Sequence, residues 1–84
     1  MVSAKIYLCK YIEVKQPFPR HHLSGYAKCE FLRKVELDDL SFILPSNYIE
    51  KLLEDKELIV IEKQLIEKLI SNKADENVYI RITL

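Results

Sequence analysis

Two segments of this chain alternate between apolar and polar residues with a period of two, the pattern of a β-strand that is buried on one side. The apolar face of residues 4–15 consists of Ile6, Leu8, Ile12 and Val14. The apolar face of residues 26–37 consists of Ala27, Cys29, Phe31, Val35 and Leu37. Between the two segments, residues 16–25 contain two prolines and the only glycine, which is typical of a loop. The sequence therefore predicts an N-terminal antiparallel β-hairpin.

The register of this hairpin can be predicted by matching the two apolar faces. The best match sets Ile6 opposite Val35 and Ile12 opposite Cys29. On the other face it sets lysines opposite glutamates, and each directly opposed pair of opposite charges contributes about 0.2–1 kcal/mol. We expect this register.

The second half of the chain predicts helices and two further strands. The expected elements are a short helix from Asp38 to Leu44, a helix from Asn47 to about Glu54, a strand over residues 57–61, an amphipathic helix ending near Asn72, and a strand over residues 77–84. Residues 57–61 also fit a helix start, and we favour the strand because the segment is rich in β-branched residues. The fold class is α+β: a small antiparallel sheet packed against two helices, in the order β-β-α-(β)-α-β, as one domain over residues 1–84.

Residues 42–53, followed by residues 58–61, resemble the strand–proline–helix–strand unit of AbrB-type swapped-hairpin regulators. The resemblance covers about a quarter of the chain. The glycine turn that follows the helix in that family is missing here, and no residue role is transferred.

Charge is distributed unevenly along the chain. Residues 1–34 contain seven lysines and arginines and two glutamates, whereas residues 35–84 contain six basic and eleven acidic residues. Such asymmetry indicates binding partners rather than a fold. The basic half also contains aromatic residues, a combination that suits a nucleic-acid surface. A chain with opposite charges in its two halves could also associate with a second copy, and we expect a homodimer.

The two cysteines and two histidines offer the ligand types of a zinc site, but their spacing is poor. In the predicted register Cys9 and Cys29 project from opposite sides of the sheet, which argues against both a shared metal and a disulfide unless a bulge shifts one strand. We expect two free thiols, no metal and no cofactor. No apolar stretch is long enough to cross a membrane and no secretory leader is visible, so we expect a cytoplasmic protein without membrane contact.

Lys10 and Arg33 interrupt the apolar faces of their strands and are diagonal neighbours in the predicted register. Either they meet acids of the second half, such as Glu62 or Glu67, or they form an anion-binding site. The loop offers an aromatic ring and several donors for a nucleic acid, although the ring could equally pack on the core. The candidate binding residues are Lys10, Lys15, Phe18, Arg20, His21 and Arg33.

No arrangement of nucleophile, base and oxyanion donors can be assembled from this sequence. We therefore expect that the protein is not an enzyme. The expected function is that of a small accessory or regulatory module that contacts nucleic acid through the basic, aromatic hairpin and loop. The alternative is a protein-interaction subunit or inhibitor that uses the acidic helical half and the Pro17-Phe18-Pro19 loop.

Overall fold

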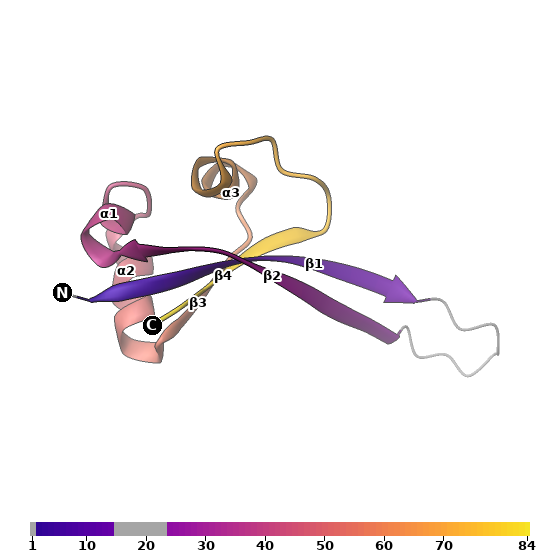
Figure 1. Cartoon of the computed structure of the whole chain (residues 1–84), viewed down its shortest axis with the longest axis horizontal. Helices are drawn as coiled ribbons and strands as arrows, with labels where there is room; N and C mark the ends of the chain where they lie inside the picture. Colours follow the sequence, from indigo (N-terminus) through magenta and orange to yellow (C-terminus); the bar gives the residue numbers. More distant parts are fainter. Residues whose placement is uncertain (1, 15–23) are drawn as a thin grey trace.

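The computed structural model describes residues 2–14 and 24–84, with side chains described for residues 2–12 and 26–84. The elements in chain order are β1 (Ser3–Val14), β2 (Ser24–Glu36), α1 (Leu37–Ser41), α2 (Ser46–Asp55), β3 (Glu57–Val60), α3 (Lys63–Ile70) and β4 (Val78–Thr83) (Figure 1). The predicted α+β class is confirmed, with a four-stranded antiparallel sheet and three helices in the order β-β-α-α-β-α-β. Residues 57–60 form a strand, so the strand interpretation of this segment is confirmed except at its last residue.

The strand order of the sheet is β2-β1-β4-β3. The C-terminal strand β4 therefore lies between β1 and β3 and is antiparallel to both. β4 pairs with β1 only over residues 5–10, whereas β2 follows β1 to its end. The outer parts of β1 and β2 consequently project beyond the rest of the sheet (Figure 1). We call residues 11–14 and 24–27 the hairpin arm.

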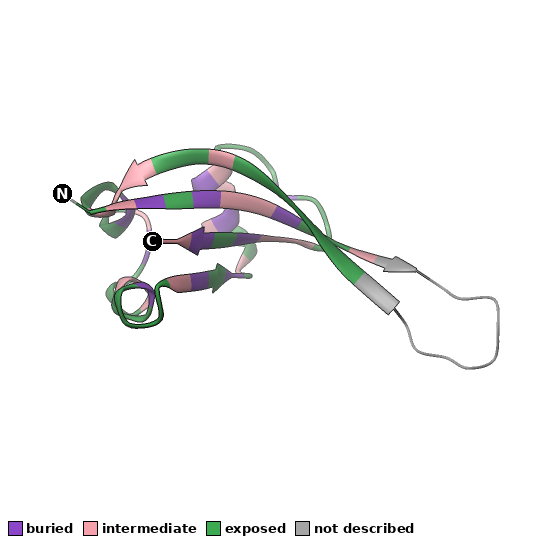
Figure 2. Cartoon of the chain, turned by 60° about the horizontal axis from the view of Figure 1, so that its bottom comes forward, coloured by how far each residue is buried: buried purple, intermediate pink, exposed green. Residues whose placement is uncertain are grey.

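All three helices pack on one face of the sheet, because their buried side chains join one core cluster with residues of β1, β3 and β4. The buried members of this cluster are Ala4, Ile6, Leu40, Leu44, Leu52, Leu58, Val60, Ile66, Leu69, Ala74, Ile80 and Ile82. We call this side the helical face and the other side of the sheet the open face. Figure 2 shows this pattern as buried and exposed residues alternating along the strands. Packing of this kind is the main source of the fold's stability.

The helix ends differ in detail from the prediction. α1 ends at Ser41, three residues earlier than expected, and Phe42–Leu44 form a turn rather than the strand that the resemblance to AbrB-type proteins requires. α2 begins at Ser46 with Pro45 at the N-cap position, so Asn47 is not its cap. Proline is preorganised for a helix start because its φ is fixed, here at −57°.

The predicted hairpin exists, but its predicted register is wrong. Ile6 lies opposite Arg33, and Ile12 lies opposite Tyr26. A register shift between Ile6 and Tyr7 leaves Leu32 as an extra residue in β2, which is a β-bulge. A bulge changes which side chains share a face of the strand. The residues of β2 before the bulge therefore alternate between the two faces in the opposite phase from the residues after it.

The bulge reverses the expected orientation of the first half of β2. The apolar residues Ala27, Cys29 and Phe31 lie on the open face and are exposed, although alternation predicted them to be in the core. Val35, beyond the bulge, packs against the core as predicted. The cross-strand charge pairs that favour the predicted register contribute only about 0.2–1 kcal/mol each. Packing of β1 against β4, where Ile6 lies beside Ile82, has a larger effect.

Candidate functional site

The open face carries a row of side chains that crosses all four strands. In this row Phe31 of β2 lies opposite Tyr7 of β1, Tyr7 lies opposite Arg81 of β4, and Arg81 lies opposite Ile59 of β3. The rings of Tyr7 and Phe31 meet edge to face, with their centroids 5.6 Å apart. Phe31 keeps 52% of its surface exposed. Tyr7 is partly buried, so the row offers one exposed ring and one partly exposed ring, on which flat aromatic groups can stack.

Tyr79 extends this aromatic surface along β4. It lies two residues from Arg81 on the same face of the strand, because Ile80 and Ile82 between and beyond them point into the core. Successive residues on one face of a strand are about 7 Å apart. We call Tyr7, Phe31, Tyr79 and Arg81 the aromatic platform.

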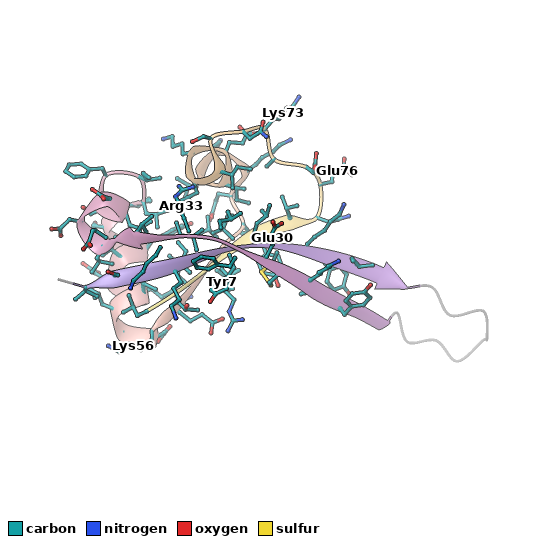
Figure 3. The ribbon with its side chains drawn as sticks, viewed as in Figure 1. Tyr7, Glu30, Arg33, Lys56, Lys73 and Glu76 are labelled. Atoms are coloured by element: carbon teal, nitrogen blue, oxygen red, sulfur yellow. A yellow bond between two sulfur atoms is a disulfide. The ribbon has the colours of Figure 1, made fainter. Side chains whose placement is uncertain are left out.

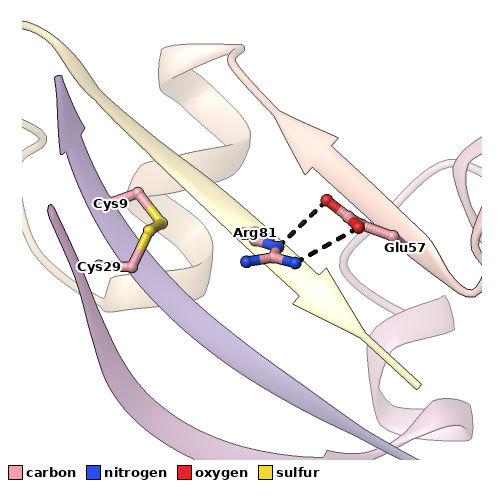
Figure 4. Close-up of polar contacts among 4 residues, drawn as sticks. All are labelled: Cys9, Cys29, Glu57 and Arg81. Carbon is pink, nitrogen blue, oxygen red and sulfur yellow. Dashed lines mark hydrogen bonds and ion pairs between the residues drawn. A yellow bond between two sulfur atoms is a disulfide. The ribbon is translucent and has the colours of Figure 1, made fainter. Parts of the chain in front are cut away.

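Arg81 is held in place by an ion pair with Glu57 of β3. Its Nε lies 3.1 Å from Glu57 Oε1, and its Nη2 lies 3.4 Å from Oε2 (Figure 4). Such a two-point contact fixes the plane of the guanidinium group. Among residues 2–12 and 26–84, whose side chains the structure describes, this ion pair is the only one.

Beside the platform, two lysines lie directly opposite each other. Lys5 of β1 faces Lys34 of β2, and both side chains are exposed. Neither forms an ion pair in the described part of the chain. Directly opposed like charges destabilise a sheet. An anion bound between the two ammonium groups would remove that cost, so this pair is a candidate phosphate contact.

A disulfide joins Cys9 to Cys29 on the open face, next to the platform (Figure 4). Our prediction that these cysteines project from opposite sides of the sheet is therefore wrong, and the bulge at Leu32 is the physical reason. The prediction of free thiols is also wrong. A disulfide offers no thiolate for zinc. It also withdraws the support that free thiols gave to a cytoplasmic location, which stays a prediction.

Arg33 is exposed but makes one hydrogen bond within the fold. Its side chain points from β2 toward α3, on the side of the sheet opposite to Tyr7 (Figure 3). Its Nη2 donates a hydrogen bond to the carbonyl oxygen of Leu69, in the last turn of α3. Cations interact favourably with the exposed carbonyls at a helix C-terminus. Arg33 thus meets neither Glu62 nor Glu67, the two acids that we considered.

Lys10 lies on the helical face, in a groove between the strands and the loop that follows α3. The groove has a volume of about 550 Å³, and its lining residues are Leu8, Lys10, Ile12, Lys28, Cys29, Glu30, Asp75 and Val78. Lys10 lies directly opposite Lys28, so it is not a neighbour of Arg33 as predicted. Two like charges again oppose each other, here with Glu30 and Asp75 in the same groove.

The remaining candidate binding residues, Lys15, Phe18, Arg20 and His21, lie outside the described residues. The structure does not bring Lys10 and Arg33 together. Sequence reasoning missed the platform, because Tyr79 and Arg81 were not connected with the hairpin. The alternation around Ile80 could have placed both side chains on the polar face of the last strand.

A side-chain hydrogen bond links α2 to the residue that precedes α3. The Tyr48 hydroxyl of α2 donates a hydrogen bond to Glu62 Oε1, immediately before α3. This hydrogen bond lowers the pKa of the Glu62 carboxyl and raises the pKa of the Tyr48 hydroxyl. The contact lies on the helical side of the sheet, and its position between α2 and α3 gives it a structural role.

Within residues 2–14 and 24–84, no group of three or more metal-ligating side chains is gathered, and no helix has the length and apolar composition that a membrane span requires. Comparison of the chain with protein-family models, curated proteins and solved structures finds no match.

Proposed function

We propose that this protein is a small non-catalytic module that binds single-stranded nucleic acid on the open face of its sheet. The observation that carries the proposal is the Tyr7–Phe31 ring pair lying beside the opposed lysines Lys5 and Lys34. Bases stack on exposed rings whatever their sequence, and lysines neutralise the phosphates that connect them. Replacing a ring and replacing a lysine should therefore change binding in different ways that can be measured separately.

The geometry of the platform supports this proposal in two ways. The row of Phe31, Tyr7 and Arg81 runs across the strands, so that a strand of nucleic acid could cross the sheet with successive bases on neighbouring residues. Arg81 adds a flat guanidinium group, whose plane the Glu57 contact fixes, and such groups also stack on bases. Lys15, Phe18, Arg20 and His21, which lie outside the described residues, stay predicted contacts.

The proposal is tested by measuring the fluorescence anisotropy of a labelled single-stranded oligonucleotide. Replacing a stacking ring should weaken binding by about 1–3 kcal/mol per base, or roughly five- to 150-fold, and leave the salt dependence nearly unchanged. We expect this result for Phe31→Ala and Tyr79→Ala. Phe42→Ala is the matched control, because Phe42 is 88% exposed but follows α1, away from the open face.

The lysine pair is tested in the same assay. Lys34→Ala should reduce the slope of log affinity against log salt by about one, since it removes one phosphate contact. Lys51→Ala on α2, also exposed, should leave the slope unchanged. Absence of binding at low salt by the unmodified protein would refute the proposal.

The protein-interaction alternative has one observation in its favour. The apolar residues Phe42 and Ile61 are strongly exposed outside the sheet's open face, among the acidic residues of the second half. Exposed apolar groups with a polar rim are typical of protein contacts. If oligonucleotides do not bind and Phe42→Ala abolishes capture of a protein partner, this function replaces the first.

A further inference from the structure

The outer edge of β2 is free along the sheet. β2 is the terminal strand in the order β2-β1-β4-β3, and within residues 2–14 and 24–84 no backbone hydrogen bond from another element reaches that edge. At 13 residues it is much longer than β3, the four-residue strand at the other end of the sheet. Figure 2 shows β2 along the margin of the sheet with mostly exposed residues. A long free edge can pair with another strand.

The structure also shows which backbone groups point outward from β2. The Cα atoms of Cys9 and Cys29 are 4.0 Å apart, the short separation of a pair that shares no backbone hydrogen bonds. The N–H and C=O groups of Cys29 therefore point away from β1, toward the outer edge, and those of Ala27 and Phe31 do the same. Tyr11 N–H, in phase with Cys9, correspondingly bonds Asn77 on the opposite side.

We propose that a second copy of this chain pairs with β2 in antiparallel orientation, with the two-fold axis at Cys29. The outward-pointing backbone groups of β2 in one copy must meet the outward-pointing backbone groups of β2 in the other copy. Only registers that pair the odd-numbered residues of the two copies with one another are therefore possible. An axis at Lys28 sets two lysines opposite each other, and an axis at Glu30 sets two glutamates opposite each other. The axis at Cys29 instead sets Lys28 opposite Glu30 of the second copy, twice by symmetry.

Two features of the single chain support this register. Lys28 lies opposite Lys10, and Glu30 lies opposite the apolar Leu8, so neither charge has an opposite charge as its direct cross-strand neighbour. Pairing with the second copy supplies one to each. The same register places Phe31 opposite Ala27 of the second copy on the open face, which covers part of an exposed ring. The result is a continuous eight-stranded sheet. This inference does not depend on nucleic-acid binding.

Exchange of the charges on the edge tests the register. Lys28→Glu and Glu30→Lys each oppose like charges at both symmetric positions and should raise the dimer dissociation constant by about tenfold or more. The double variant Lys28→Glu/Glu30→Lys should restore the constant of the unmodified protein. Lys51→Glu on α2 is the matched control and should change nothing. Lys28→Glu should also fold well, because it gives Lys10 an opposite charge.

The decisive measurement is sedimentation equilibrium of the two single variants, separately and mixed. In a mixture, the charges that repel within each variant attract between them, so we expect a heterodimer from two proteins that are monomeric alone. A monomeric unmodified protein would overturn the proposal, and so would a mixture without heterodimer or a double variant that stays monomeric.

Discussion

Cys9 lies directly opposite Cys29 across β1 and β2, and the bulge at Leu32 allows both sulfurs to lie on one face. The disulfide lies at the base of the hairpin arm and joins two cysteines that are 20 positions apart in the sequence. In the chain-entropy account, a bridge across such a loop stabilises the folded state mainly by restricting the unfolded chain.

We therefore expect reduction to lower the free energy of unfolding by about 3 kcal/mol. Chemical denaturation with and without a thiol reductant measures the difference. Cys29→Ala should match the reduced protein in both buffers, since Cys29 is exposed and its side chain fills no core space. Equal stability with and without reductant would contradict the account, and alkylation of the denatured, unreduced protein should label no thiol.

Arg33 should be a stabilising residue and not a ligand contact. Its hydrogen bond to the Leu69 carbonyl joins β2 to the end of α3. Arg33→Met keeps an apolar stem but removes the donor. We expect the free energy of unfolding, measured by thermal or chemical denaturation, to fall by about 1 kcal/mol. Oligonucleotide affinity of the folded variant should stay within about twofold of the unmodified protein at fixed salt. A large loss of affinity with unchanged stability would show that the original prediction for Arg33 was right.

The Tyr48–Glu62 contact should make stability depend on pH in the acid range. The pKa of Glu62 is lower in the folded protein than its ordinary value of 4.5, chiefly because of the Tyr48 hydrogen bond. The contribution of ionised Glu62 to the stability of the fold is therefore complete above the ordinary pKa and is lost as the pH falls through the lowered pKa of the folded protein. Tyr48→Phe should reduce this acid loss, as measured by denaturation between neutral pH and the acid range. Tyr26→Phe, in the exposed arm, is the control, and identical acid profiles for both variants would contradict the prediction.

The sequence predicts the kinds of elements here better than their alignment. Period-two alternation finds β1, β2 and β4, because side chains alternate across a strand, although only β1 and β4 bury side chains on one face and β2 is mostly exposed. The bulge at Leu32 has no comparable local signal, and it reverses the face of every residue that precedes it in β2. The disulfide depends on the bulge and was missed for that reason.

The platform could not be predicted because it depends on contacts between distant parts of the chain. Alternation places Tyr79 and Arg81 on the polar face of the last strand, but only the pairing of β4 with β1 brings Arg81 beside Tyr7. That pairing is set by burial of Ile80 and Ile82 under the helices. The sequence places Phe31 in the core, since an apolar residue at that position in a regular hairpin would face inward.

The central claim, that nucleic acid binds on the open face, is tested most directly by mapping backbone amides with NMR while a short single-stranded oligonucleotide is added at low salt. We predict the largest chemical-shift changes at Tyr7, Phe31, Tyr79 and Arg81, with little change along α2, and reversal of the changes when salt is raised. Changes that gather on α2 and α3, or no changes at any oligonucleotide concentration, would contradict the claim.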